Sequence, residues 1–240
     1  MNETKTEIRF VGFGGQGIIL AAHITGRAIT IYEKSNATLT QNYGPESRGG
    51  SCAAGLIISD QPINYPHLTK PDVLVVLSPE GYNKYKDDIK NNGLIIVEEN
   101  ILPVVSIPEP CSAPRAVEPG RTVAECPPER LINRAGTDID KKPKARTLAV
   151  PAARLAREIG KKVVTNMIVL GFMVRVFECN ELHPTIPGSN SLRSNCQSMT
   201  AATKFVSKEA MRQSIATSVP PGTEELNLKA FEMGYSNYKP

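Results

Sequence analysis

The chain has 240 residues, which suits one large domain or one domain carrying insertions. Hydrophobic residues make up 40% of it, and a net charge of +4 is too weak a bias to indicate nucleic-acid binding. The N-terminal residues are mostly polar, unlike an export signal, and the longest apolar stretch, 163–177, is too short to span a bilayer. Five cysteines without a C-x-x-C pair favour reduced thiols, so we expect a cytoplasmic protein with no nucleic-acid or membrane partner.

Apolar runs and their periodicity predict strands that alternate with helices along most of the chain. Runs of strand-like length lie at residues 8–13, 51–59, 72–77, 94–97 and 146–150. Helical spacing or helix-start residues lie at 18–31, 81–90, 151–159, 163–177, 208–218 and 224–235. This alternation predicts a Rossmann-like α/β fold with a largely parallel sheet and helices on both faces.

Two stretches break the alternation. Residues 103–143 hold eight of the 19 prolines and show no sustained periodicity, and residues 178–203 are rich in Asn, Ser and Pro. Stretches of this length without secondary-structure patterns are typically functional, partner-binding or disordered. We therefore interpret residues 1–240 as one domain with two insertions.

A glycine-rich turn follows the first predicted strand and opens the first predicted helix. Its sequence matches G-x-G-x-x-G, with candidate ligand-binding residues Gly12, Gly14, Gly15, Gln16 and Gly17. Glycines let the backbone approach a ligand closely, and exposed amides at the start of a helix favour an anion such as pyrophosphate. A tight turn that serves packing alone remains the alternative.

A dinucleotide site would also need an acidic residue about 20 residues further along, at the end of a second strand. Glu33 lies near that distance but sits in a polar stretch with no apolar strand after it. The sequence therefore favours a nucleotide- or phosphate-facing turn over the pattern of an NAD(P)-dependent dehydrogenase.

A second polar loop, at residues 41–52, leads into the next apolar strand. Arg48, beside Gly49 and Gly50, has the planar fork that binds a phosphate or carboxylate through two parallel hydrogen bonds. An internal ion pair between Glu46 and Arg48 is the alternative.

The other reactive side chains form no recognisable catalytic or metal-binding set. Cys111 and Cys126 lie in the first insertion and Cys179 and Cys196 in the second, at spacings that match no metal pattern. The three histidines assemble neither a Ser–His–Asp set nor an H-E-x-x-H helix. The chain thus lacks an evident catalytic apparatus of its own.

The two loops together resemble the gamma subunit of 2-oxoacid:ferredoxin oxidoreductases of the pyruvate, 2-oxoglutarate or ketoisovalerate type. The segments that carry the resemblance are 12–17, 36–41, 43–50, 71–75, 166–171 and 219–231. The second loop differs from that of the related indolepyruvate enzymes, in which a Ser-Gln-Arg-Gly-Gly type of sequence stands at this place. The resemblance implies candidate contacts at Tyr43, Gly44, Pro45, Glu46, Ser47, Arg48, Gly49 and Gly50.

Such enzymes decarboxylate a 2-oxoacid oxidatively, join the acyl group to coenzyme A and reduce ferredoxin. The resemblance implies that this chain holds no cofactor alone. Thiamine diphosphate, Mg and iron–sulfur clusters would lie on alpha, beta and delta-type partner subunits, and this chain would help assembly and the coenzyme A side of the active site. A stand-alone NAD(P)-binding dehydrogenase and a non-catalytic scaffold subunit remain the alternatives.

Overall fold

A computed structural model of the chain describes residues 5–44, 50–102, 145–178 and 206–238. Both predicted insertions fall almost wholly outside these ranges, as do Cys111, Cys126, Cys179 and Cys196. The single-domain interpretation therefore stays a prediction. Among the helices in these ranges, none combines the length and the apolar character that crossing a bilayer requires.

The described residues form a six-stranded sheet in the order β2-β3-β1-β4-β5-β6. The strands are β1 (Lys5–Phe13), β2 (Asn36–Tyr43), β3 (Ser51–Ser59), β4 (Val73–Val76), β5 (Leu94–Glu98) and β6 (Arg146–Val150). β1, β4, β5 and β6 pair in parallel, whereas β3 is antiparallel to both of its neighbours. Five strands therefore point the same way, and their carboxyl ends share one edge of the sheet.

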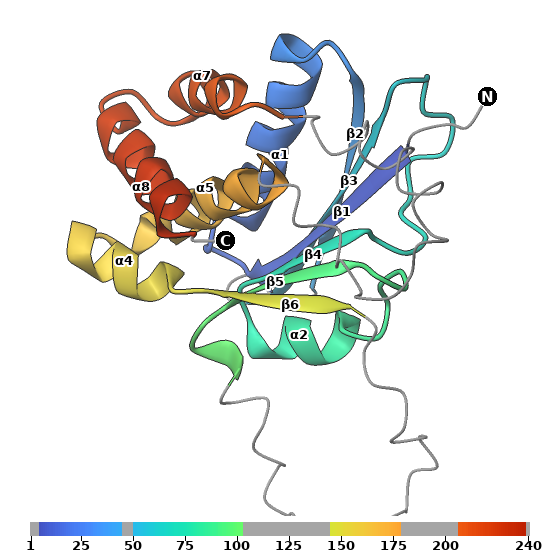
Figure 1. The fold of residues 1–240 in the computed structure, drawn as a ribbon, viewed down its shortest axis with the longest axis horizontal. Helices are drawn as coiled ribbons and strands as arrows, with labels where there is room; N and C mark the ends of the chain where they lie inside the picture. The colour runs from blue at the N-terminus through green and yellow to red at the C-terminus, as the bar shows by residue number, and fades with distance from the viewer. Residues whose placement is uncertain (1–4, 45–49, 103–144, 179–205, 239–240) are drawn as a thin grey trace, which may run out of the picture.

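Helices cover both faces of the sheet, unequally (Figure 1). One face carries α1 (Ile18–Arg27), α4 (Ala152–Ile159), α5 (Thr165–Glu178), α7 (Lys208–Ser218) and α8 (Glu224–Asn237), and the other carries α2 (Pro79–Tyr85). Two short elements, the π-helix η1 (Ala28–Tyr32) and the 3-10 helix η3 (Lys162–Val164), follow α1 and precede α5. The larger hydrophobic cluster lies on the many-helix face, and a smaller one lies beneath α2.

Local chemistry sets the helix boundaries. Ser78 caps α2 by accepting a hydrogen bond from the Gly81 amide at 3.1 Å, and Pro79 supplies the preset first turn. Ser207 caps α7 in the same way through the Ala210 amide at 3.2 Å. Gly160 ends α4 with φ +86°, a left-handed conformation that few other residues adopt without strain.

α5 lies at the centre of the helical layer and is buried along almost its whole length. It crosses α8 with Gly171 against the backbone of Phe231 and Tyr235, and with Gly234 against the backbone of Ile168, so a β-carbon at either glycine would overlap backbone of the facing helix. Each contact is possible because the glycine has no β-carbon, so the two glycines set how closely α5 and α8 approach.

The structure confirms the α/β class and all five predicted strands, but it adds an element that the sequence pattern missed. We expected no apolar strand after Glu33, and the strand that follows it, β2 at residues 36–43, is polar and was not predicted. β2 is a polar edge strand, paired only with β3 within the described sheet, so it lacks an apolar run. The predicted helix 81–90 is also shorter, since α2 ends at Tyr85.

Candidate functional site

The glycine turn and the second loop lie side by side at the carboxyl edge of the sheet. Pairing of β3 with both β1 and β2 brings Ser51 opposite Phe13 and Cys52 opposite Tyr43. The Gly14 amide donates a hydrogen bond to the Gly50 carbonyl oxygen at 2.9 Å, which ties the turn to the loop directly.

The second loop is the connection between β2 and β3. The Gly44 amide closes its base by donating to the Ser51 carbonyl oxygen at 2.7 Å. Tyr43 is largely exposed beside this base, whereas Pro45, Glu46, Ser47, Arg48 and Gly49 lie outside the described residues. The described ends of the loop therefore lie beside the glycine turn, and the ligand contacts expected of the loop stay a prediction.

The backbone of the glycine turn needs glycine at three positions. Gly15 and Gly17 have φ values of +94° and +74°. A β-carbon at Gly17 would also lie 3.0 Å from the side-chain carbon Cγ of buried Asn166, whose amide donates to the Gly17 carbonyl oxygen at 3.3 Å. At Gly12 a β-carbon would lie 2.6 Å from Cδ1 of Ile18.

Several amides of the turn are already used within the protein. The Phe13 amide donates to Gln16 Oε1 at 2.7 Å, and the Gln16 amide donates to the Phe13 carbonyl oxygen at 3.2 Å. The Gly14 amide is held by Gly50, as described above. Much of the glycine pattern therefore serves the shape of the turn, and exposed Gly15 is the part that borders open space.

A cavity of about 640 Å³ lies on the other side of the turn, against the carboxyl ends of β4 and β5. It is bordered by the turn, by α4 and by η3. The residues that supply its polar lining are Gln16, Glu98, Asn100, Arg157, Lys162 and Thr165. A cavity of this size matches the range of small-molecule sites.

Gln16 connects the glycine turn to this cavity. Its side-chain Nε2 donates to the Leu77 carbonyl oxygen at 3.0 Å, across the ends of β1 and β4. Since its Oε1 accepts from Phe13, both ends of the amide are engaged and the side chain is held between the two strands.

Glu98 is the buried acid of the cavity, with 7% of its surface exposed. Its carboxylate accepts hydrogen bonds from the Asn100 amide at 3.1 Å and from Asn100 Nδ2 at 2.7 Å. Burial raises the pKa of the Glu98 carboxyl, and hydrogen bonds from the backbone of Ala153 and from Asn100 oppose that rise. The sequence analysis missed Glu98, although an acid closing a buried run in a parallel sheet marks the carboxyl edge.

Glu33, the acid weighed for a dinucleotide site, is used elsewhere. It lies just before β2, at the amino end of that strand, and so at the edge opposite the glycine turn. Its Oε1 accepts a hydrogen bond from the Ser207 amide at 2.9 Å, which links the end of η1 to the start of α7. A ribose contact requires the carboxyl end of the strand, so Glu33 cannot fill that role in this fold.

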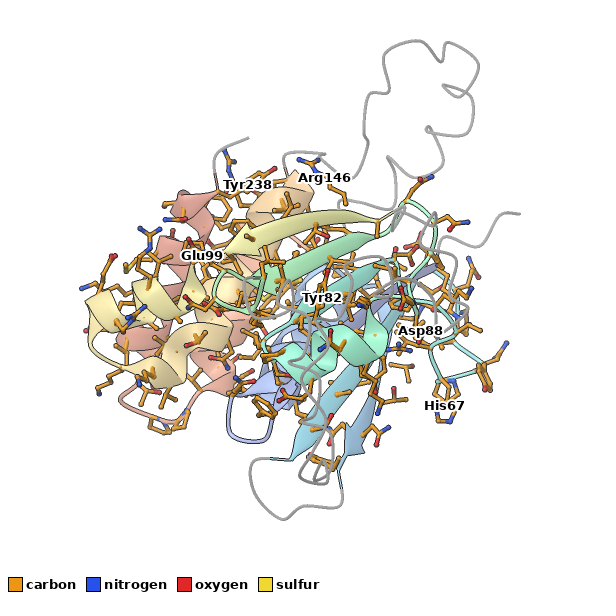
Figure 2. All side chains as sticks on the ribbon, turned by 90° about the horizontal axis from the view of Figure 1, so that it is seen from below. His67, Tyr82, Asp88, Glu99, Arg146 and Tyr238 are labelled. Atoms are coloured by element: carbon orange, nitrogen blue, oxygen red, sulfur yellow. The ribbon has the colours of Figure 1, made fainter. Side chains whose placement is uncertain are left out.

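Within the described ranges, no three His, Cys, Asp or Glu side chains gather as a metal site would require. Cys52 is buried at the start of β3, and burial raises the pKa of its thiol, which disfavours the reactive thiolate. His67, Tyr82 and Asp88 lie on the α2 side of the sheet, away from the 640 Å³ cavity (Figure 2).

Comparison with known proteins identifies one family. The model of the family described as pyruvate ferredoxin/flavodoxin oxidoreductase matches residues 7–184. The 2-oxoglutarate synthase subunit KorC of Methanocaldococcus jannaschii is 37% identical over 232 residues, which cover 96% of this chain and 92% of the relative.

Solved structures agree on the fold. The gamma subunit of the keto/oxoacid ferredoxin oxidoreductase from Geobacter sulfurreducens matches with a TM-score of 0.61 at 28% identity and covers 96% of each chain. The 2-oxoglutarate:ferredoxin oxidoreductase from Magnetococcus marinus, solved with 2-oxoglutarate, coenzyme A and succinyl-CoA bound, matches with a TM-score of 0.63 at 16% identity. This chain covers 31% of that longer chain, and at this identity the match speaks for the fold alone.

Proposed function

Since the chain belongs to the pyruvate ferredoxin/flavodoxin oxidoreductase family, as a gamma-type subunit of a 2-oxoacid:ferredoxin oxidoreductase, we propose that its complex acts on 2-oxoglutarate. The observation that carries the choice of 2-oxoacid is the 37% identity to a 2-oxoglutarate synthase subunit across 96% of this chain. The complex would convert 2-oxoglutarate and coenzyme A to succinyl-CoA and CO₂. Two electrons would pass to ferredoxin, and one proton would be released.

The decarboxylation and electron transfer of this reaction require cofactors, which we assign to partner subunits. The sequence has no Gly-Asp-Gly segment for the magnesium of thiamine diphosphate and no clustered cysteines for iron–sulfur. We therefore assign thiamine diphosphate, Mg and iron–sulfur clusters to the alpha, beta and delta-type subunits, with ferredoxin as the electron acceptor.

This chain would complete the coenzyme A side of the active site. The edge formed by the glycine turn and the β2–β3 loop supports that placement, because both loops project from one end of a rigid sheet. Exposed Gly15 allows close backbone approach, and the guanidinium of Arg48 has the geometry to bind a phosphate of coenzyme A through two parallel hydrogen bonds.

A non-catalytic scaffold subunit is the second candidate. The observation that favours it is the internal use of the Phe13, Gly14 and Gln16 amides, which an anion-binding turn would offer to its ligand. The two functions predict different effects of a substitution in the β2–β3 loop on the KM of the assembled complex for coenzyme A.

The first test is purification of the tagged chain together with its partners. We expect thiamine diphosphate and iron–sulfur subunits to co-purify, and the complex to reduce ferredoxin faster with 2-oxoglutarate than with pyruvate or ketoisovalerate. A chain that never associates with a thiamine-bearing partner would contradict the function, and a complex that prefers pyruvate would contradict the choice of 2-oxoacid.

The second test separates the active-site role from the scaffold role. Arg48→Ala should raise the KM for coenzyme A about tenfold, as expected when a charge-assisted contact is lost, with the KM for 2-oxoglutarate unchanged. Arg154→Ala, on the exposed side of α4, is the charge-matched control. An unchanged KM for coenzyme A in Arg48→Ala would favour the scaffold.

A further inference from the structure

We propose that the 640 Å³ cavity binds a phosphate-bearing ligand, with its anionic group at Arg157 and Lys162 and a hydroxyl or amino group on Glu98. This site is distinct from the β2–β3 loop. Its lining residues come from the glycine turn, from the carboxyl ends of β4 and β5 and the residues just after them, and from α4, η3 and the first residue of α5. The proposal is argued from residues of this chain alone. It rests on the proposed function only for whether the ligand is coenzyme A or a free nucleotide.

The position of the cavity is the first argument. After β1 the chain passes to α1 on one face of the sheet, and after β4 it passes to α2 on the other face (Figure 1). The crevice between the carboxyl ends of β1 and β4 is therefore the point where the crossovers change sides. Open α/β sheets bind ligands at this point, and Gln16 and Leu77, which both line the cavity, are joined across it by a hydrogen bond.

The charges of the lining are the second argument. Arg157 and Lys162 come from α4 and η3, so their positions are set by two different elements that border the cavity. Arg157 Nε donates to the Ala153 carbonyl oxygen at 3.2 Å, which holds the guanidinium stem along the helix. Two cations beside an exposed glycine suit a phosphate or pyrophosphate group.

Glu98 supplies the opposite sign at the buried end. Among the ion pairs of the described ranges, none joins Glu98 to Arg157 or Lys162, so the acid and the cations are held apart within one cavity. A carboxylate has about four acceptor positions, more than its bonds to Asn100 and to the backbone of Ala153 use. The arrangement therefore fits a ligand with an anion at one end and a hydrogen-bond donor at the other, as in a nucleotide.

The test is calorimetric titration of the purified full chain with ADP, coenzyme A and pyrophosphate. The double variant Arg157→Ala/Lys162→Ala should bind each of the three probes about tenfold or more weakly, because the loss of one charged contact alone costs about tenfold in affinity. Arg154→Ala, one turn earlier on α4 and outside the lining, should leave all three unchanged.

Glu98→Gln separates the two ends of the site. This variant should bind ADP about tenfold more weakly, because the amide lacks the charge and one of the acceptor oxygens of the carboxylate. Pyrophosphate does not extend to Glu98, so it should bind as well as before or more tightly. Far-ultraviolet circular dichroism of each variant shows whether the fold is retained, and a variant that loses the fold is replaced by Arg157→Gln or Glu98→Asp.

Two results overturn the proposal: no binding of any of the three probes, or binding that the paired cation change leaves intact. Tighter binding of coenzyme A than of ADP identifies the ligand as part of coenzyme A, whereas tighter binding of ADP identifies a free nucleotide. A complex that assembles and oxidises 2-oxoglutarate while its gamma chain binds none of the probes would sink this site and leave the proposed function standing.

Discussion

Gln16 and Leu77 join the ends of two strands that are 61 positions apart along the chain, through a 3.0 Å hydrogen bond from the side-chain amide of one to the backbone carbonyl of the other. The same amide group accepts from Phe13, so it fixes the glycine turn against β4. Because Gln16 and Gly15 line the cavity and Gly14 is bonded to Gly50 of the loop, this side chain helps to fix the turn between the loop and the cavity.

Gln16→Glu tests that role with almost no change in size. A carboxylate still accepts from Phe13, but it places a second acceptor against the Leu77 carbonyl oxygen. We expect the free energy of unfolding to fall by roughly 1–3 kcal/mol, as when a partly buried carbonyl loses its donor. Urea denaturation measures it, and Gln61→Glu at an exposed position should change it little; equal losses in the two variants would contradict the role of Gln16.

The α5–α8 crossing predicts strong sensitivity at its two glycines. A β-carbon at Gly171 would lie 2.8 Å from the Tyr235 backbone nitrogen, and one at Gly234 would lie 2.7 Å from the Ile168 carbonyl carbon. Backbone must move apart to admit either, so Gly171→Ala and Gly234→Ala should each cost at least about 1–3 kcal/mol despite alanine's better helix propensity. Thermal unfolding measures this loss of stability, and Ser236→Ala, at an exposed position on α8, is the control. A Gly171→Ala variant that is more stable than the native protein would contradict the close approach of the two helices.

The buried carboxyl of Glu98 predicts a pH dependence of stability. Burial raises its pKa above the ordinary value of 4.5, so the unfolded chain releases this proton at lower pH than the folded chain does. The stability that protonated Glu98 contributes is therefore full below that ordinary value and is lost as the pH rises through the folded-state pKa. Relative to Glu98→Gln, the native protein should lose unfolding free energy across this window and then level off.

Urea denaturation at several values between about pH 4 and 8 follows the difference between the two proteins. Glu158→Gln, at an exposed position on α4, should show no comparable trend. A difference that grows as the pH rises would mean that the hydrogen bonds from Asn100 and Ala153 outweigh burial.

Substitution of Glu33 should lower the stability of the protein, whereas at a dinucleotide site it would lower the affinity for the nucleotide. Glu33→Ala removes the acceptor of the Ser207 amide and should lower the unfolding free energy by about 1 kcal/mol, as for the loss of a helix-end partner. Glu225→Ala, exposed in the first turn of α8, is the matched control. Nicotinamide nucleotide that binds the native chain and is lost in Glu33→Ala would revive the dehydrogenase interpretation.

The sequence predicted the strands that consist of apolar runs. It did not predict the polar strand or the hydrogen bonds that depend on how segments pair in three dimensions. β4 and β5 are buried on both faces and read as continuous apolar runs, whereas β2 is polar because one of its edges and much of its surface meet solvent. The glycine turn was visible as a motif, but its internal hydrogen bonds to Gln16 and Gly50 were not.

The cavity could not be read from the sequence for a similar reason. Leu77, Glu98, Arg157 and Lys162 come from four separate elements, and each is unremarkable in its own segment. Only the parallel alignment of β4 and β5, together with the return of the chain through α4, gathers them at one edge. The α5–α8 crossing likewise places Gly171 and Gly234 against residues of the facing helix that no local sequence pattern connects to them.

The bond between the Gly14 amide and the Gly50 carbonyl makes two neighbouring events mutually dependent. If a partner subunit contacts the β2–β3 hairpin, this bond transmits the contact to the beginning of α1, and a ligand bound at the turn would act on the hairpin through the same bond. Thermodynamic reciprocity then requires that any effect of partner binding on ligand affinity be matched by an equal effect of the ligand on partner affinity. The antiparallel direction of β3, which brings the β2–β3 hairpin to the same end of the sheet as the glycine turn, is what makes this coupling route available.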